Sequence, residues 1–196
     1  MSIRIGFVDF RLENYHANVF LRAFRGPLAA RGAIVAGCFA MDASDGRTWA
    51  AKNDVAWCED VAAMNDRVDA FMVLAPSNPE LHLELCERVF PFAKPTYIDK
   101  TFAPNLGAAK EIFALADRFH TPVQTTSALR YTAAQKFVRD HPAEPILHMT
   151  AWGGGSSFAE YAIHPVEMIV SCMGAGAISL MRRGIGGHSQ LLINFT

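Results

Sequence analysis

The stretch that decides the fold of this chain is Lys94-Pro95-Thr96-Tyr97-Ile98-Asp99-Lys100-Thr101-Phe102-Ala103-Pro104. Its centre, Thr96 to Ile98, predicts a short buried β-strand that ends on an acid and a lysine. In an open parallel sheet the carboxyl ends of the strands face the crevice in which ligands bind. Lys100 is therefore in a position to donate a proton there, and the alternative is an ordinary surface lysine after a strand.

A similar strand lies upstream of this stretch, from Val68 to Ala75. It is apolar and stops at a turn, Pro76-Ser77-Asn78, after which residues 81–86 have the pattern of a helix. The chain therefore repeats strand, polar turn and helix before it reaches Asp99 and Lys100, which is typical of a parallel α/β sheet.

This run of motifs, continued to residues 122–131, resembles the Gfo/Idh/MocA family of nicotinamide-dependent oxidoreductases. The resemblance implies NAD or NADP as the cofactor and a lysine beside the nicotinamide and the substrate carbinol, here Lys100. Family members usually have Glu-Lys-Pro where this sequence has Asp99-Lys100-Thr101. The resemblance also implies that Pro76, Ser77, Asn78 and Asp99 contact the cofactor, and it gives the same role to His82, for which a packing or surface role is the alternative.

The composition excludes several classes of protein. The 196 residues, 51% of them hydrophobic and 19% charged, suffice for one domain or one and a half with a packed core. A net charge of −1 does not indicate a basic surface that would bind nucleic acid or an anionic membrane. No apolar run approaches the ~20 residues of a membrane span. Four widely spaced cysteines without a zinc pattern predict reduced thiols in a cytoplasmic protein without a metal site.

The chain opens with a predicted βαβ unit. Residues 3–8 and 33–39 read as strands, and residues 17–30 have helical spacing. A dinucleotide-binding loop after the first strand normally reads G-x-G-x-x-G, because glycines let backbone amides approach the pyrophosphate. The loop here is instead Asp9-Phe10-Arg11-Leu12-Glu13-Asn14-Tyr15-His16, in which Asp9 would repel a phosphate. Either the Arg11 side chain or the amides at the start of the helix could still bind one, and Asp9, Phe10 and Arg11 are the cofactor contacts that we expect from this loop.

Other residues of the first part complete the predicted cofactor site. Asp42 follows the second strand, where a carboxylate usually binds the ribose hydroxyls of NAD, and it can equally be a turn residue or a helix N-cap. Residues 48–53 and 105–119 predict helices, and residues 55–57 and 122–126 predict strands. Arg130 corresponds to the segment that lines the substrate cleft in the resembled family, and a surface ion pair is the alternative role.

The second part of the chain predicts a mixture of helices and strands. Helices are expected at residues 132–140 and 158–172, and strands at 146–152, 177–181 and 191–195, with a turn from Arg182 to Gly187. Glu160 and His164 lie four apart on the second helix and can touch. The resemblance assigns catalysis to His164, with Glu160 as its orienting acid and Tyr161 beside them as a substrate contact, whereas a solvated helical pair is the alternative.

These observations predict a doubly wound parallel-sheet Rossmann domain at residues 1–127 and a shortened α+β domain at residues 128–196 for substrate binding or dimerisation. The resemblance implies hydride transfer to or from a sugar, polyol or related hydroxy compound, with Lys100 as the cation and proton relay and His164 as the base. The alternative is an inactive relative that acts as a ligand-binding, regulatory or assembly protein. The partners expected are a small substrate and a second copy of the chain, joined through the C-terminal sheet.

Overall fold

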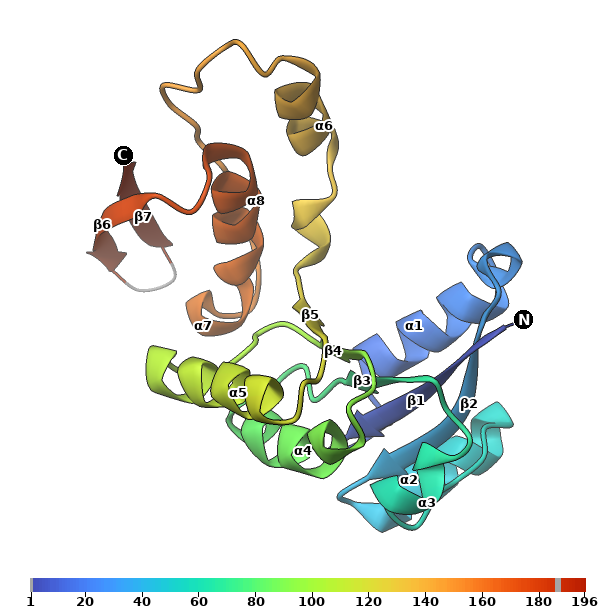
Figure 1. Ribbon diagram of the computed structural model, residues 1–196. Coiled ribbons are helices and arrows are strands. Elements are labelled where there is room, and N and C mark those ends of the chain that lie inside the picture. The colour runs from blue at the N-terminus through green and yellow to red at the C-terminus, as the bar shows by residue number, and fades with distance from the viewer. Residues whose placement is uncertain (1, 186–187) are drawn as a thin grey trace. The chain divides into compact units, whose positions relative to one another are not determined.

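Five parallel strands form the central sheet of the first part of the chain, in the order β2-β1-β3-β4-β5 (Figure 1). The computed structural model describes residues 2–185 and 188–196. Reversal of the strand order beside β1 creates the switch point at which parallel sheets bind ligands. The strands are β1 (Ile3–Asp9), β2 (Ala33–Ala40), β3 (Ala70–Val73), β4 (Thr96–Ile98) and β5 (Val123–Thr125).

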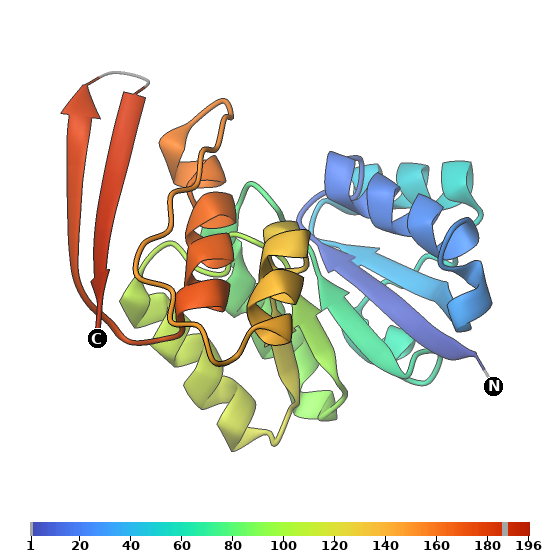
Figure 2. The same cartoon turned by 90° about the horizontal axis from the view of Figure 1, so that it is seen from above.

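Helices cover both faces of this sheet, because side chains alternate along each strand and both faces are apolar (Figure 2). Phe7 packs with α1 and α2 on one face, whereas Val8 packs with α3, α4 and α5 on the other. The fold is thus the predicted doubly wound α/β fold. The helices are α1 (Tyr15–Arg25), α2 (Ala43–Asn53), α3 (Val61–Asn65), α4 (His82–Val89) and α5 (Leu106–Arg118).

Short polar residues set where these helices begin. The side chains of Asn14, Asp42, Asp60 and Asn105 each accept a hydrogen bond from a backbone amide in the first turn of the helix that follows. Each such cap stabilises a helix by about 1 kcal/mol relative to alanine. For Asp42, the structure therefore bears out the N-cap role that the sequence left open.

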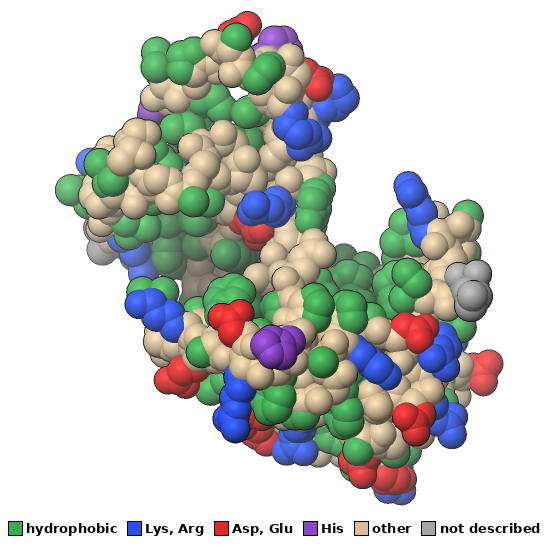
Figure 3. Space-filling model, in the orientation of Figure 1, with side chains coloured by type: hydrophobic (Ala, Val, Ile, Leu, Met, Phe, Trp, Pro, Cys, Tyr) green, Lys and Arg blue, Asp and Glu red, His purple; other side chains and the backbone are tan. Residues whose placement is uncertain are grey.

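The chain divides into two compact units, the first ending at Thr125 and the second running from Thr126 to Thr196. In the second unit, α8 packs against α6 and against the short 3₁₀ helix Ala128–Arg130, and β6 and β7 form an antiparallel hairpin. Figure 3 shows acidic and basic side chains interspersed over the first unit and a mainly uncharged face on the second. The elements of the second unit are α6 (Ala133–Asp140), α7 (Phe158–Tyr161), α8 (Ile163–Met173), β6 (Ala177–Ile185) and β7 (His188–Phe195).

Several predicted elements differ from the structure. The helix expected at residues 17–30 runs from Tyr15 to Arg25 and stops before Gly26-Pro27, because proline cannot continue the backbone ladder. The helix expected at residues 158–172 is broken at Ala162, because Pro165 has no amide hydrogen to donate to Tyr161.

Two of the predicted strands were wrong. Residues 146–152 form no strand, and Leu147 and Trp152 are each 89% exposed, so alternation there reflects no packed face. The strand expected at residues 55–57 is only a single bridge between Cys38 and Trp57. The turn expected at 182–187 was also misplaced: residues 182–185 continue β6, and Gly186 and Gly187 lie outside the described residues.

The chain contains no helix, among its described residues, with the length and apolar character needed to cross a bilayer. Cys38, Cys58 and Cys86 are buried free thiols, and Cys172 is half-buried. Burial raises the pKa of Cys38 to about 12, so this thiol stays protonated and packs as an apolar group.

Candidate functional site

Lys100 follows β4 at the carboxyl edge of the sheet, where the sequence predicts it. Its side chain is half-buried, and its Nζ lies 3.4 Å from the carbonyl oxygen of Pro76, in the loop after β3. The neighbouring Asp99 is almost completely buried and accepts a 2.9 Å hydrogen bond from the backbone amide of Lys100. A cation is thereby held between the ends of two adjacent strands, where a ligand of a parallel sheet binds.

His16 forms an ion pair with Asp99 that the sequence did not indicate. Its Nδ1 contacts Asp99 Oδ2 from the first turn of α1, and 23% of the histidine side chain remains exposed. Asp99 Oδ1 also accepts a 3.3 Å hydrogen bond from the Tyr97 hydroxyl. The edge of the sheet therefore carries a buried acid and an oriented imidazole directly beside Lys100.

The side chain of Asp9 is hydrogen-bonded to the backbone of the loop between β1 and α1. Its Oδ1 accepts hydrogen bonds from the amides of Phe10 at 2.7 Å, Arg11 at 3.2 Å and Ala75 at 3.1 Å, and its Oδ2 accepts one from Asn14 Nδ2 at 2.9 Å. Burial nevertheless dominates and raises the pKa of Asp9 to about 7. The carboxylate occupies backbone donors of the loop and joins the ends of β1 and β3.

A second carboxylate occupies the next two amides of the same loop. Oδ2 of Asp45, in the first turn of α2, accepts hydrogen bonds from the amides of Leu12 at 2.7 Å and Glu13 at 3.2 Å. Backbone amides of this loop are the groups that normally hold a pyrophosphate in this fold. In this arrangement the loop does not fit a pyrophosphate, since its donors are bonded to the protein's own acids.

Asp42 and Arg11 are both used structurally. Arg11 Nε lies 3.1 Å from Asp42 Oδ2, and hydrogen bonds from the α2 backbone and the nearby guanidinium lower the pKa of Asp42. Asp42 and Asp45 line a shallow pocket of about 360 Å³ together with Glu13. A ribose could donate hydroxyl groups to these carboxylates, but a phosphate would be repelled by them.

His82 is completely buried, and its contact with the cofactor stays a prediction. Its Nδ1 lies 2.9 Å from the carbonyl oxygen of Phe102, and its Nε2 lies 2.9 Å from that of Leu74 and 3.2 Å from that of Ala75. The ring thus connects the loops that follow β3 and β4, and its role is to position them.

The turn after β3 places Asn78 at the carboxyl edge of the sheet. Asn78 begins the 3₁₀ helix Pro79–Leu81, and its Nδ2 donates a 3.0 Å hydrogen bond to Glu80. That bond lowers the pKa of Glu80. The carbonyl oxygen of Pro76 contacts the amine of Lys100, and Ser77, which lies between Pro76 and Asn78 in the sequence, is exposed. These three residues remain accessible to a ligand.

In the second unit, His164 lies on α8 with its Nδ1 2.6 Å from the Ser127 hydroxyl. Glu160 on α7 accepts a 3.2 Å hydrogen bond from Ser156, and the Tyr161 ring centroid lies 6.0 Å from that of His164. The structure therefore supplies Ser127 as an orienting group for the imidazole, whereas the orienting role of Glu160 stays a prediction.

Glu167 organises the start of this second unit. Its carboxylate accepts a 2.5 Å hydrogen bond from the Ser127 amide and a 3.1 Å bond from the Thr126 hydroxyl. Arg130 lies 3.4 Å from the same carboxylate, so the predicted substrate contact is engaged in an ion pair inside the unit. Glu167 thus holds the segment that carries Ser127.

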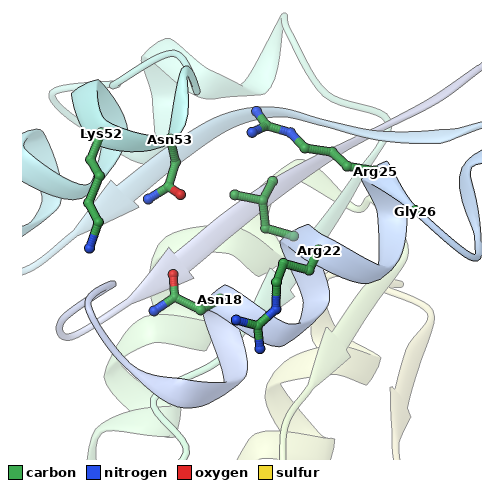
Figure 4. Close-up of a pocket in the computed structure, with 7 residues that line it drawn as sticks. Asn18, Arg22, Arg25, Gly26, Lys52 and Asn53 are labelled. Carbon is green, nitrogen blue, oxygen red and sulfur yellow. The ribbon is translucent and has the colours of Figure 1, made fainter.

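A larger pocket of about 450 Å³ lies between α1 and α2, and Figure 4 shows side chains of both helices around it. It is basic, with Arg22, Arg25 and Lys52 at its wall. Two of these cations are engaged, because Arg25 donates to the carbonyl oxygen of Asp54 at 3.1 Å and Lys52 lies 2.9 Å from Glu13. The residues around this pocket are not those that the sequence singled out.

Sequence reasoning missed His16, Asp45, Ser127 and Glu167. A weak signal was available for two of them: His16 stands just after the helix N-cap Asn14, and Asp45 stands at the third position after the N-cap Asp42. Their partners lie far away along the chain, so spacing could not reveal the contacts. The part of the chain that the structure describes contains no cluster of three or more His, Cys, Asp or Glu that could hold a metal.

Comparison with known proteins finds similarity at the level of structure. No family model and no curated protein matches the sequence. The UDP-N-acetylglucosamine 3-dehydrogenase of Acidithiobacillus ferrooxidans superimposes on 99% of this chain, with 67% of its own length covered, a TM-score of 0.79 and 16% identity. An oxidoreductase from Agrobacterium radiobacter, in complex with NAD+, L-tartaric acid and magnesium, covers 100% of this chain and is itself covered over 64%, with a TM-score of 0.74 and 14% identity.

Other matches cover the chain only in part. The WlbA dehydrogenase from Bordetella pertussis, in complex with NADH and UDP-GlcNAcA, matches 72% of this chain with a TM-score of 0.59 and 14% identity. This chain spans 41% of the length of that protein. At such identities the comparisons establish the fold alone, a parallel-sheet α/β fold that this chain shares with these proteins.

Proposed function

We propose that this chain is an oxidoreductase of the Gfo/Idh/MocA type that uses NAD or NADP and acts on a CH–OH group of a sugar, polyol or related hydroxy compound. The observation that carries this proposal is the half-buried Lys100, which follows a buried acid at the carboxyl end of β4. Support comes from the fold, because the similar structures include complexes with NADH or NAD+ and with a nucleotide sugar acid or tartrate.

The proposed chemistry needs an acid–base pair and a cation. Removal of a hydroxyl proton requires a base, and the oxyanion that develops requires a nearby positive charge. Lys100 is proposed as the cation and proton relay. His164 is proposed as the base, with Nδ1 donating to the Ser127 hydroxyl so that Nε2 carries the lone pair that accepts the proton. Glu160 and Tyr161 are proposed as further groups around the imidazole.

The remaining predicted contacts are proposed according to their accessibility. Ser77 and Asn78 are proposed to contact the cofactor beside Lys100, and Asp42 to accept from ribose hydroxyls. Residues 1–127 are the proposed dinucleotide-binding domain, and residues 128–196 the proposed domain for substrate binding and pairing with a second copy. We propose the cytoplasm as the place of action.

A titration of the whole chain with NADH and NADPH, followed by nucleotide fluorescence, tests this proposal. Saturable binding is expected, followed by turnover with a member of a panel of sugars, polyols, nucleotide sugars and hydroxy acids. Lys100→Met should lower kcat/KM by roughly 100-fold or more, the usual contribution of a positioned proton-transfer group, while cofactor affinity is retained. The exposed lysine variant Lys110→Met is the control. Equal activity in the two variants would remove Lys100 from the site.

A second candidate is a ligand-binding relative without catalysis. The observation that favours it is the loop after β1, whose amides are bonded to Asp9 and Asp45. In that case NADH should fail to bind up to millimolar concentration, whereas a hydroxy compound from the same panel should raise the melting temperature. Saturable NADH binding would reject this alternative.

A further inference from the structure

Asp45 bonds backbone amides of the β1–α1 loop, which is the loop that holds the pyrophosphate in dinucleotide complexes of this fold. Its Oδ2 accepts from two consecutive backbone amides, those of Leu12 and Glu13, at 2.7 and 3.2 Å. Two consecutive amides that converge on one oxygen form the arrangement by which loops bind anions. The anion here belongs to the protein itself.

The charges around Asp45 further disfavour the binding of a phosphate group at the amides of Leu12 and Glu13. The adjoining pocket of about 360 Å³ is lined by three carboxylates, those of Glu13, Asp42 and Asp45. The nearby cations are already paired, because Arg11 lies 3.1 Å from Asp42 and Lys52 lies 2.9 Å from Glu13. A pyrophosphate entering the loop would have to displace one carboxylate and remain close to two others.

We infer that Asp45 is a specificity-determining residue that keeps phosphate groups out of the β1–α1 loop, so that a dinucleotide bound by this chain is held without the amides of this loop. The inference rests on the proposed function, because it concerns how the proposed cofactor is bound. The affinity for the dinucleotide then has a different origin from that in a protein with a glycine-rich loop. In this chain the contacts to the ribose and the nicotinamide must supply the binding free energy, because the loop amides do not contact the pyrophosphate.

Amide NMR of the whole chain tests the inference with inorganic pyrophosphate as the probe. In the wild type, pyrophosphate should leave the amide resonances of Leu12 and Glu13 unchanged. In Asp45→Ala, both resonances should shift saturably, with an affinity for pyrophosphate at least tenfold higher than in the wild type. Ser44→Ala is the matched control: it alters an exposed residue that lines the same pocket, and it should behave as the wild type does.

Two results would overturn the inference. One is a saturable shift of Leu12 and Glu13 in the wild type with pyrophosphate or NADH, and the other is the absence of any gain in Asp45→Ala. Should that variant fail to fold, Asp45→Asn removes the charge and keeps the size, and the same gain is required of it. NADH titrated in parallel tests the proposed function separately, through the amides of Asn78 and Lys100. If NADH shifts no resonance, the function fails while the pyrophosphate result still decides the role of Asp45.

Discussion

The carboxyl group of Asp9 is almost completely buried, and that burial raises its pKa from about 4 to about 7. The folded state therefore binds a proton between these values that the unfolded state has lost. Stability is then highest below about pH 4, falls as the pH rises toward 7 and is constant above it. With 1.36 kcal/mol for each pH unit, the folded chain would lose up to about 4 kcal/mol over this range.

Asp9→Asn should remove this fall in stability, because asparagine keeps an acceptor for the loop amides and does not ionise. The free energy of unfolding, measured with urea between pH 4 and pH 8, gives the slope for both proteins. The exposed acid variant Asp117→Asn is the control and should keep the wild-type slope. A slope that survives unchanged in Asp9→Asn would contradict the assignment.

The pairing of His16 with Asp99 makes a second prediction for individual residues. His16→Ala leaves the buried carboxylate of Asp99 without the side chain that contacts its Oδ2, and breaking a buried pair typically costs about 3 kcal/mol in unfolding free energy. In an Asp99→Asn background, the same histidine substitution should cost much less, because no buried charge is left unpaired. Urea unfolding of the two single variants and the double variant measures this coupling. Additive costs would mean that the two side chains do not stabilise each other.

The helix α2 lies so close to β2 that Gly46 has no room for a side chain. A Cβ at this position would lie 2.3 Å from the Trp57 ring and 2.9 Å from Cβ of Ala40. Gly46→Ala should therefore destabilise the fold by about 1–3 kcal/mol, as overpacking does in a dense core. Gly154→Ala is a matched control, because a Cβ there meets nothing within 4 Å. Equal melting temperatures for both variants would contradict this packing.

The elements that the sequence predicted best are those with a strong periodic pattern and clear boundaries. The helix α5 begins after Asn105 and ends near Pro122 as expected, because its cap and its breaker are local signals. The strand predicted at residues 146–152 failed because alternation reports a packed face only when a neighbouring strand exists. Asp99 and Lys100 could be placed at the carboxyl edge of the sheet because they directly follow a predicted strand of a parallel sheet.

The polar contacts of the site were beyond what spacing can reveal. His16 meets Asp99, and Asp45 meets the amide of Leu12, only after the sheet has brought their elements together. The contact between Ser127 and His164 likewise joins two residues that are 37 positions apart along the chain. The fold was therefore predictable from local patterns, whereas the hydrogen bonds of the site depend on long-range packing.

At the scale of the whole molecule, the hairpin β6–β7 exposes an unusual amount of apolar surface. Ile178, Leu180 and Met181 on β6 and Leu192 on β7 are each more than half exposed. A two-stranded sheet is marginally stable alone, so cover by a second copy would stabilise it. This supports the proposed pairing through the C-terminal sheet.

Leu180→Lys should weaken self-association at least tenfold in sedimentation equilibrium, because it puts a charge into the surface that would be covered. Leu106→Lys is the matched control, since that leucine on α5 is 70% exposed and Leu180 is 62% exposed. A wild type that sediments as a monomer at all concentrations would remove the pairing proposal.

The buried ring of His82 has a mechanical consequence for the first unit. It is hydrogen-bonded at 2.9 Å to backbone oxygens in the segments that follow two adjacent strands. Neither segment can shift by an ångström without breaking a bond or dragging the other along. A ligand that binds at Asn78 and displaces the segment after β3 would therefore also displace the backbone beside Lys100. The position of the lysine amine would thus depend on binding at the neighbouring strand.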